Sequence, residues 1–359
     1  MASAPATVII SDVPDHSKAG LRLNFSHNHQ YHPLFSSPAA DVVLCASDGV
    51  MYRMHSYTLR TTSGFFRDMF TLPQPNPPPR LGLFSENNEK RGDIFVSTYV
   101  SSGILTLFLM LTCGMPINTP LHEWGIFSVS DSSPDTGCIE TSLHSCFDTI
   151  DRVLRLAENW DAPGPLSYLR LGLRNPELVK QDPLKLFSIA SHFGWEYERK
   201  WAAQHSLMID ISPLLDTHIQ KNLEDMSSKD LLCLLKLRHR RKEEFRAFID
   251  DPEHFSVGNS ENILCMRCHE ARIDNGTWKV LKEAMVMELE RRPLGDSIVG
   301  SEVGGIGGEH LAEGIVTWPE AEACFNASCE KKGCKSPNYD ACATLKQIQG
   351  CVDSLPWEL

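Results

Sequence analysis

One stretch of the chain, 41–70, changes its hydrophobic period halfway and so limits what this part can fold into. Its first half, 41–55, consists of two short apolar runs separated by Ser-Asp-Gly, which is typical of two strands joined by a tight turn. From Ser56 onward the apolar residues recur at helical spacing, and Ser63 and Gly64 divide this part into two short helices. The stretch therefore predicts a strand, a turn and a second strand, followed directly by helices.

A further strand and helix are expected in 94–121, a segment without Asp, Glu, Lys or Arg. Its length would be sufficient to span a bilayer. However, serines and threonines dilute the segment, Gly103 and Pro116 interrupt it, and no cationic cluster flanks it. We therefore expect a buried strand at 94–96 and a core helix over about 102–111, and no membrane span.

Three short strands form a sheet that is too small to be stable alone, so helices must cover it. Burial of a large apolar side chain contributes roughly 1.5–3 kcal/mol. We expect five side chains between the helices and the sheet to provide this burial: Leu59, Phe65, Phe66, Met69 and Phe70.

The rest of the chain is dominated by helical periodicity. Residues 1–38 read as a polar, loosely ordered lead-in with order starting at Asp41, and 116–146 reads as a Ser/Asp/Gly/Pro-rich insertion. Helices are expected over 146–161, 164–173, 182–210 (a hairpin split at Gly194), 227–245 (capped by Ser227 or Ser228) and 277–293. This order of elements predicts an α+β fold, with a mixed head followed by an all-helical section.

Composition excludes some classes of function. The net charge of −12 argues against nucleic acid or an acidic membrane surface as the main partner. The basic run 236–242 runs into two glutamates within an amphipathic helix, which indicates a solvated helix face. No signal peptide is visible, so the twelve cysteines are expected to be thiols or metal ligands in an intracellular protein of the cytoplasm or nucleus.

The residues from 41 to 75 resemble the BTB/POZ domain, specifically its large fungal branch. The resemblance rests on Asp41 at the first strand, the Asp48-Gly49 turn, His55 at the end of the second strand, Leu59, and the Ser-x-Phe-Phe-x-x-Met-Phe of 63–70. It continues less closely through the later helices and covers about 38–290.

This resemblance implies a BTB/POZ head over 39–173, a helical extension over 174–255 and a cysteine-rich module over 256–359. The function that it implies is protein–protein interaction without catalysis. The expected partners are a second copy of the chain in a homodimer, a client protein and, as in some relatives, a cullin-type ubiquitin ligase scaffold. Asp41 and His55 are the candidate interaction residues because such positions lie near the family's dimer groove. As isolated residues, Asp41 is equally well interpreted as a turn cap and His55 as a surface histidine.

The cysteines near the end of the chain have the spacing of a zinc site. Cys265-x2-Cys268 is followed, after about 55 residues, by a C-x4-C-x4-C pattern. Tetrahedral zinc takes four soft ligands, usually supplied as two local pairs, and the helix expected at 277–293 is long enough to separate two such pairs. The predicted ligands of a structural zinc ion are Cys265, Cys268, Cys329 and Cys334, with Cys324 as the rival and His269 as an adjacent alternative.

Other interpretations of these cysteines stay open. Cys265-x-x-Cys268-His269 also has the form of a covalent haem attachment site, although that attachment is normally made outside the cytoplasm. A thiol-based redox or metal-dependent enzyme centred on Cys265 and Cys268 is a second class of function. A zinc-containing transcriptional regulator is a third, against which the acidic charge and the lack of a finger repeat count. Ordinary buried thiols are the alternative to any metal.

Overall fold

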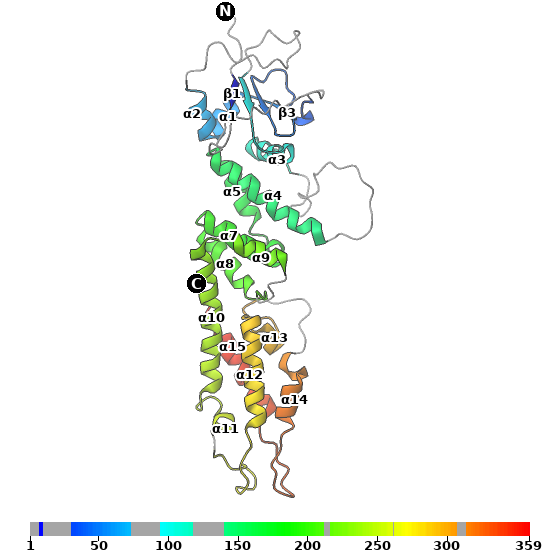
Figure 1. Cartoon of the computed structure of the whole chain (residues 1–359), viewed down its shortest axis with the longest axis vertical. Coiled ribbons are helices and arrows are strands. Elements are labelled where there is room, and N and C mark those ends of the chain that lie inside the picture. The colour runs from blue at the N-terminus through cyan, green and yellow to red at the C-terminus, as the bar shows by residue number, and fades with distance from the viewer. Residues whose placement is uncertain are drawn as a thin grey trace, which may run out of the picture. The chain divides into compact units, whose positions relative to one another are not determined.

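The computed structural model describes residues 7–9, 30–72, 94–117, 140–211, 216–260, 262–306 and 314–359, with the backbone alone described at 7–9 and 140–146. Two compact units make up the chain, Met1–Asn175 and Pro176–Leu359. The strands of the described residues lie in the first unit and the second unit is helical (Figure 1). The fold is therefore mixed α+β, as predicted.

The first unit is built around a four-stranded sheet with the order β1-β4-β2-β3 (Figure 1). β2 (Val42–Cys45) and β3 (Met51–Met54) are antiparallel and are joined by a turn in which Gly49 has a φ of +87°. β4 (Ile94–Ser97) pairs parallel with β2, and β1 (Thr7–Ile9) pairs parallel with the other side of β4. β2, β3 and β4 are the three predicted strands, and β1 is a fourth that was not predicted, because three residues are too few to show a strand period.

The helices of the first unit are α1 (Ser56–Thr62), α2 (Gly64–Met69), α3 (Ser102–Thr112), α4 (Glu140–Asn159) and α5 (Pro163–Gly172). The predicted break between the first two is confirmed: the Ser63 hydroxyl accepts a hydrogen bond from the Phe66 N–H and so caps α2. α4 begins before the predicted start at 146. Most of the predicted insertion, 118–139, lies outside the described residues.

Three of the five expected core side chains, those of Leu59, Phe66 and Met69, are fully buried. Phe65 and Phe70 are only half-buried, which corrects the prediction for these two. Both lie at the edge of the aromatic core, where the Phe65 ring stacks on Trp160 with centroids 6.3 Å apart. The helical spacing identified the buried face correctly but could not show where that face ends.

The chain joins the fold before Asp41, contrary to the predicted start of order. The His32 N–H donates to the Met51 carbonyl, and the His32 ring stacks on Tyr52 with centroids 5.1 Å apart. Phe35, in the short 3-10 helix η1 (Pro33–Phe35), is buried. This segment therefore covers part of the outer edge of β3.

The charge-free segment forms β4 and α3, as predicted. α3 has eleven residues, and it buries six apolar side chains of the segment: Ile104, Leu105, Leu107, Phe108, Leu109 and Leu111. Within the described ranges, no helix combines the length and the apolar character that crossing a membrane requires.

The second unit contains α6 (Pro176–Gln181), α7 (Pro183–His192), α8 (Glu196–Ser206), α9 (Thr217–Glu224), α10 (Ser228–Asp250), α11 (Ser256–Asn259), α12 (Gly276–Arg291), α13 (Asp296–Val299), the 3-10 helix η4 (Gly314–Thr317), α14 (Pro319–Phe325) and α15 (Ala341–Asp353). The hairpin of α7 and α8 turns at Gly194, and Ser227 caps α10, both as predicted. α10 and α12 lie side by side, with α15 and α14 packed against them (Figure 1). The unit thus spans both the predicted helical extension and the predicted cysteine-rich module.

Two buried arginines of α10 hold this unit together, so the predicted solvated face of 236–242 is wrong at both positions. The Arg241 guanidinium donates to four backbone carbonyls, those of Pro293, Leu294, Leu355 and Pro356, and lies over the Trp357 ring. Arg238 donates to the carbonyls of Ser206, Ile209 and Arg291. Burial lowers the pKa of both guanidinium groups to about 10, so both stay charged at neutral pH and are stabilised by carbonyl dipoles.

Candidate metal centre

Each pair of predicted ligands lies in its own tight hairpin. In the first hairpin the Cys265 N–H donates to the Ala271 carbonyl at 2.8 Å, and Leu264 bridges to Arg272. In the second hairpin the Cys329 N–H donates to the Ser336 carbonyl at 2.9 Å, and Ser328 bridges to Pro337. α12 and α14 separate the two hairpins along the chain.

The two hairpins turn in the same unusual way. His269 directly follows Cys268 and has a φ of +54°, and Lys335 directly follows Cys334 and has a φ of +44°. Non-glycine residues rarely adopt this left-handed conformation. The same strained conformation thus follows the second cysteine of each hairpin, as is common at functional sites. In the first hairpin it accompanies a hydrogen bond from the His269 N–H to the Cys265 carbonyl.

The fold brings the four predicted sulfur ligands together. The Sγ atoms of Cys265, Cys268, Cys329 and Cys334 all lie within 4.8 Å of one another. Two Sγ pairs, each joining the two hairpins, are 3.7 Å and 3.6 Å apart. These distances exceed the ~2.0 Å of a disulfide bond. They match the ~3.8 Å edge of a tetrahedron with Zn–S bonds of ~2.3 Å.

Backbone N–H groups favour the thiolate form of the first pair. Hydrogen bonds from the Ala271 and Glu270 N–H groups lower the pKa of Cys268 to about 6. Hydrogen bonds from the Cys268 and Arg267 N–H groups likewise lower the pKa of Cys265. At Cys329 the Lys331 N–H acts in the same direction, but burial and the three neighbouring sulfurs outweigh it and raise the pKa to about 12. Without a metal the cluster therefore retains protons, which a divalent cation would displace.

Cations lie beside the four sulfurs. Lys331 forms an ion pair with Glu270 at 2.5 Å, and this carboxylate raises the lysine pKa, as do the charges of Cys268 and Cys334. The Arg267 guanidinium donates to the Cys334 carbonyl at 3.3 Å. Four thiolates around one Zn²⁺ leave a net charge of about −2, which these cations offset in part.

The rivals for the metal site lie elsewhere. Cys324 is buried at the end of α14, outside the group of four sulfurs, and burial raises its pKa to about 11. His269 is exposed and is not part of the group either.

The two candidate interaction residues of the first unit have different surroundings. The Asp41 carboxylate accepts hydrogen bonds from the Ser56 N–H at 2.7 Å and from the Ser56 hydroxyl, so it caps the start of α1. Burial opposes ionisation of Asp41, but these hydrogen bonds and the nearby His55 lower its pKa overall. The His55 side chain is exposed and makes no capping hydrogen bond.

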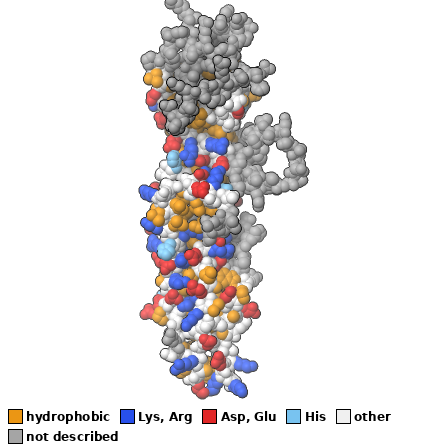
Figure 2. All heavy atoms as spheres, viewed as in Figure 1, with side chains coloured by type: hydrophobic (Ala, Val, Ile, Leu, Met, Phe, Trp, Pro, Cys, Tyr) orange, Lys and Arg blue, Asp and Glu red, His pale blue; other side chains and the backbone are white. Residues whose placement is uncertain are grey.

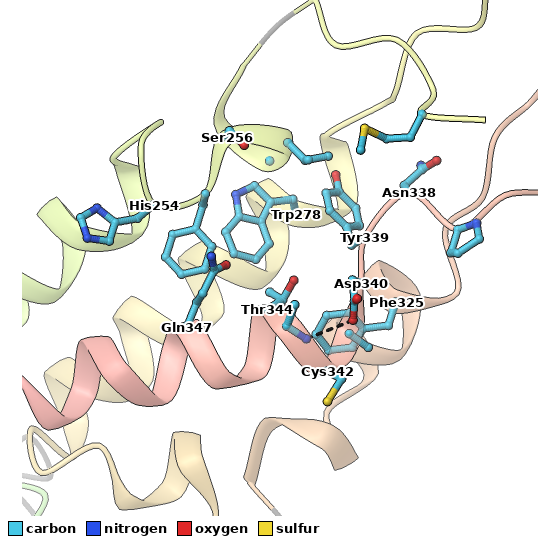
Figure 3. Close-up of a pocket in the computed structure, with 17 residues that line it drawn as sticks. His254, Ser256, Trp278, Phe325, Asn338, Tyr339, Asp340, Cys342, Thr344 and Gln347 are labelled. Carbon is cyan, nitrogen blue, oxygen red and sulfur yellow. Dashed lines mark hydrogen bonds between the residues drawn. The ribbon is translucent and has the colours of Figure 1, made fainter. Parts of the chain in front are cut away.

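The sequence did not indicate a pocket of about 670 Å³ beside the first hairpin (Figure 3). Its walls come from α11, α12, α14, α15 and both cysteine hairpins. Residues from so many separate segments leave no local spacing signal, so only the folded chain shows them together.

No protein-family model matches this chain, and none of the curated proteins matches its sequence. The chemistry of the four sulfurs is therefore the main guide to function. A zinc ion held by four protein ligands has no open position for water or a substrate, which is the arrangement of a structural site and not of a catalytic one.

Proposed function

We propose that the chain is a non-enzymatic protein-interaction protein of the BTB/POZ type whose second unit is held by one structural zinc ion. The observation that carries the zinc assignment is the set of four sulfurs at tetrahedral spacing. Zinc is favoured over other cations because thiolates are soft ligands and the site has four of them. The ion would join the two hairpins, which already contact each other through the Lys331–Glu270 ion pair and the hydrogen bond from Arg267 to the Cys334 carbonyl.

The interaction role is supported by the first unit. The residues that resemble the BTB/POZ pattern form β2, the Gly49 turn, β3 and the two helices α1 and α2 in the order that the family requires. On α1 the Tyr57 side chain is 77% exposed, and on α5 Leu171 is 64% exposed. Exposed aromatic and aliphatic side chains are common at protein interfaces. The partners that we propose are a second copy of the chain, a client protein and a cullin-type scaffold.

The thiol-redox alternative has one observation in its favour, the pKa of about 6 at Cys268. A low pKa also suits a metal ligand, because metals bind the thiolate. Each sulfur of the first hairpin lies 3.6–3.7 Å from a sulfur of the second hairpin, so no isolated dithiol exists among the four. For a DNA-associated regulator, the charges visible in Figure 2 offer little support, since cations and anions are intermixed on that face.

Native mass spectrometry of the purified full-length chain tests the proposal. We expect one zinc ion per chain and the mass of a dimer. Cys268→Ser should lose the zinc, whereas the control variant Cys324→Ser should keep it, because Cys324 is buried in α14 and lies outside the cluster. Adding a purified cullin amino-terminal domain to the same sample tests the scaffold.

Either half of the proposal can fail separately. A chain without metal after zinc loading would refute the structural zinc site. A chain that stays monomeric at micromolar concentrations and does not bind the cullin domain would refute the proposed interaction function of the first unit.

A further inference from the structure

The pocket in the second unit has walls that the metal site would position. Met266, between the two cysteines of the first hairpin, forms one wall, and Pro337–Tyr339, directly after the second hairpin, form another. α12 supplies Trp278 and α15 supplies Thr344 and other side chains; Figure 3 shows Trp278 and Tyr339 together, with Thr344 and Gln347 below them on α15. A metal ion held by the four cysteines would join the two hairpins and so fix the distance between these walls.

The inner surface of the pocket is apolar. Trp278 packs between Phe255 and Tyr339, with ring centroids 5.2 Å and 6.1 Å away. The polar groups of Trp278 and Tyr339 already have hydrogen-bond partners within the protein. The Trp278 indole N–H donates to Asn259, and the Tyr339 hydroxyl donates to Asn275. The three rings are themselves almost fully buried, and the exposed apolar side chains that line the pocket include those of Met266 and Pro337.

The contact of α11 with this cluster leaves no room for a side chain. A Cβ atom at Gly258 would lie 2.4 Å from the Trp278 ring, so the indole packs directly on the backbone. The Met266 side chain is 77% exposed at the other wall. An exposed methionine next to a rigid aromatic cluster is a common feature of surfaces that bind apolar side chains.

The charged group at the pocket is a carboxylate. Among the described residues that line it, Asp340 is the one carboxylate, and no lysine or arginine is present. One Asp340 oxygen accepts from the Ala343 N–H at 3.0 Å and so caps α15, which offsets the positive end of that helix (Figure 3). An anionic ligand would meet this carboxylate, whereas a cationic one would be attracted to it. The side chains of Asn338, Thr344 and Gln347 add neutral hydrogen-bonding groups.

We propose that this pocket binds a peptide segment of a partner protein, in which an apolar side chain enters the pocket beside Met266 and a neighbouring lysine or arginine lies against Asp340. This inference rests on the proposed interaction function and names the chemistry of the client. The volume of about 670 Å³ accommodates one large side chain with its flanking backbone.

The test is a peptide titration of the zinc-loaded full-length chain carrying ¹³C-methyl methionine. The probes are acetyl-Gly-Lys-Phe-Lys-Gly-amide and its matched counterpart with glutamate in place of both lysines. The Met266 methyl resonance, assigned with Met266→Leu, reports binding. We expect a saturable shift with the lysine peptide and roughly two- to fivefold weaker binding of the glutamate peptide, the range of one exposed ion pair.

Three variants separate pocket binding from surface attraction. Asp340→Asn keeps a good helix cap and removes the charge, so it should abolish the preference between the two peptides. Asp353→Asn removes the same charge from the other end of α15 and should leave the preference intact. Thr344→Trp should fill the cavity and eliminate the shift, with the far-ultraviolet circular dichroism showing that the helices persist.

The outcomes distinguish this inference from the proposed function. A zinc-loaded dimer in which neither peptide shifts Met266 at millimolar concentration refutes the pocket and leaves the proposed function intact. Equal binding of both peptides refutes the charge argument. A saturable, lysine-selective shift in a chain that binds no zinc supports the pocket and refutes the structural metal.

Discussion

His269→Gly should make the zinc-loaded chain more stable. The φ of +54° at this position is unfavourable for any residue with a Cβ atom, by roughly 1–2 kcal/mol. Glycine removes this strain but is more flexible when the chain is unfolded, which offsets roughly 0.5–1 kcal/mol. The imidazole is exposed, so its loss removes few contacts. The net increase in the free energy of unfolding is therefore between zero and about 1.5 kcal/mol.

Urea unfolding at a fixed free zinc concentration, followed by circular dichroism, measures this change. Lys335→Gly in the second hairpin should act in the same direction, because its φ is +44°. Gly333→Ala provides the opposite control: its φ is +88° and a Cβ atom there would meet no neighbour within 4 Å, so backbone strain alone should destabilise the chain.

The zinc content of His269→Gly decides the second half of the argument. We expect one zinc ion per chain, unchanged from the original sequence, because the four sulfurs complete the coordination. Loss of zinc would mean that the imidazole is a ligand. Unchanged zinc with reduced stability would show that His269 makes a contact stronger than the backbone strain, and the reasoning from φ would be refuted.

Three further outcomes are expected. Removal of zinc by a chelator should lower the unfolding temperature of the original chain and of Cys324→Ser, but not that of Cys268→Ser, which binds no metal from the start. An equal decrease in the unfolding temperature of all three chains would contradict the metal site. Arg241→Met should lower the free energy of unfolding by about 3–5 kcal/mol because four carbonyls lose their donor, whereas Arg240→Met on the exposed face should change it by less than about 1 kcal/mol in urea unfolding. Asp41→Ala should lower it by about 1 kcal/mol at neutral pH. Since the Asp41 pKa is lowered on folding, its contribution is present above the ordinary value of 3.8 and disappears as the pH falls through the folded pKa, so the variant and the original chain should converge in acid.

Local patterns predicted those parts of the structure that depend on neighbouring residues. The two apolar runs around Ser-Asp-Gly in 41–55 and the break at Ser63 predicted β2, β3, α1 and α2, because turn chemistry and period act within a few residues. The four cysteines that the fold brings together could be predicted because ligand pairs have characteristic short spacings. Even so, the rivalry between Cys324 and Cys329 needed the fold, which buries the first in α14 and directs the second toward the other hairpin.

Features set by distant residues could not be predicted. Arg241 reads as part of a basic surface run, and its burial depends on carbonyls that lie more than fifty residues away. The three residues of β1 become a strand only because β4 offers them an edge. The pocket around Trp278 combines six segments, so its composition is visible only after folding.

The separation of the two hairpins along the chain has a consequence for synthesis on the ribosome. The sulfurs that must meet are 61 and 69 residues apart. Cys265 and Cys268 therefore emerge long before their partners, and two thiolates alone hold an ion far less tightly than four. A zinc site of all four sulfurs could form only after Cys334 has left the exit tunnel, and until that moment the nascent chain would stay accessible to chaperones and proteases.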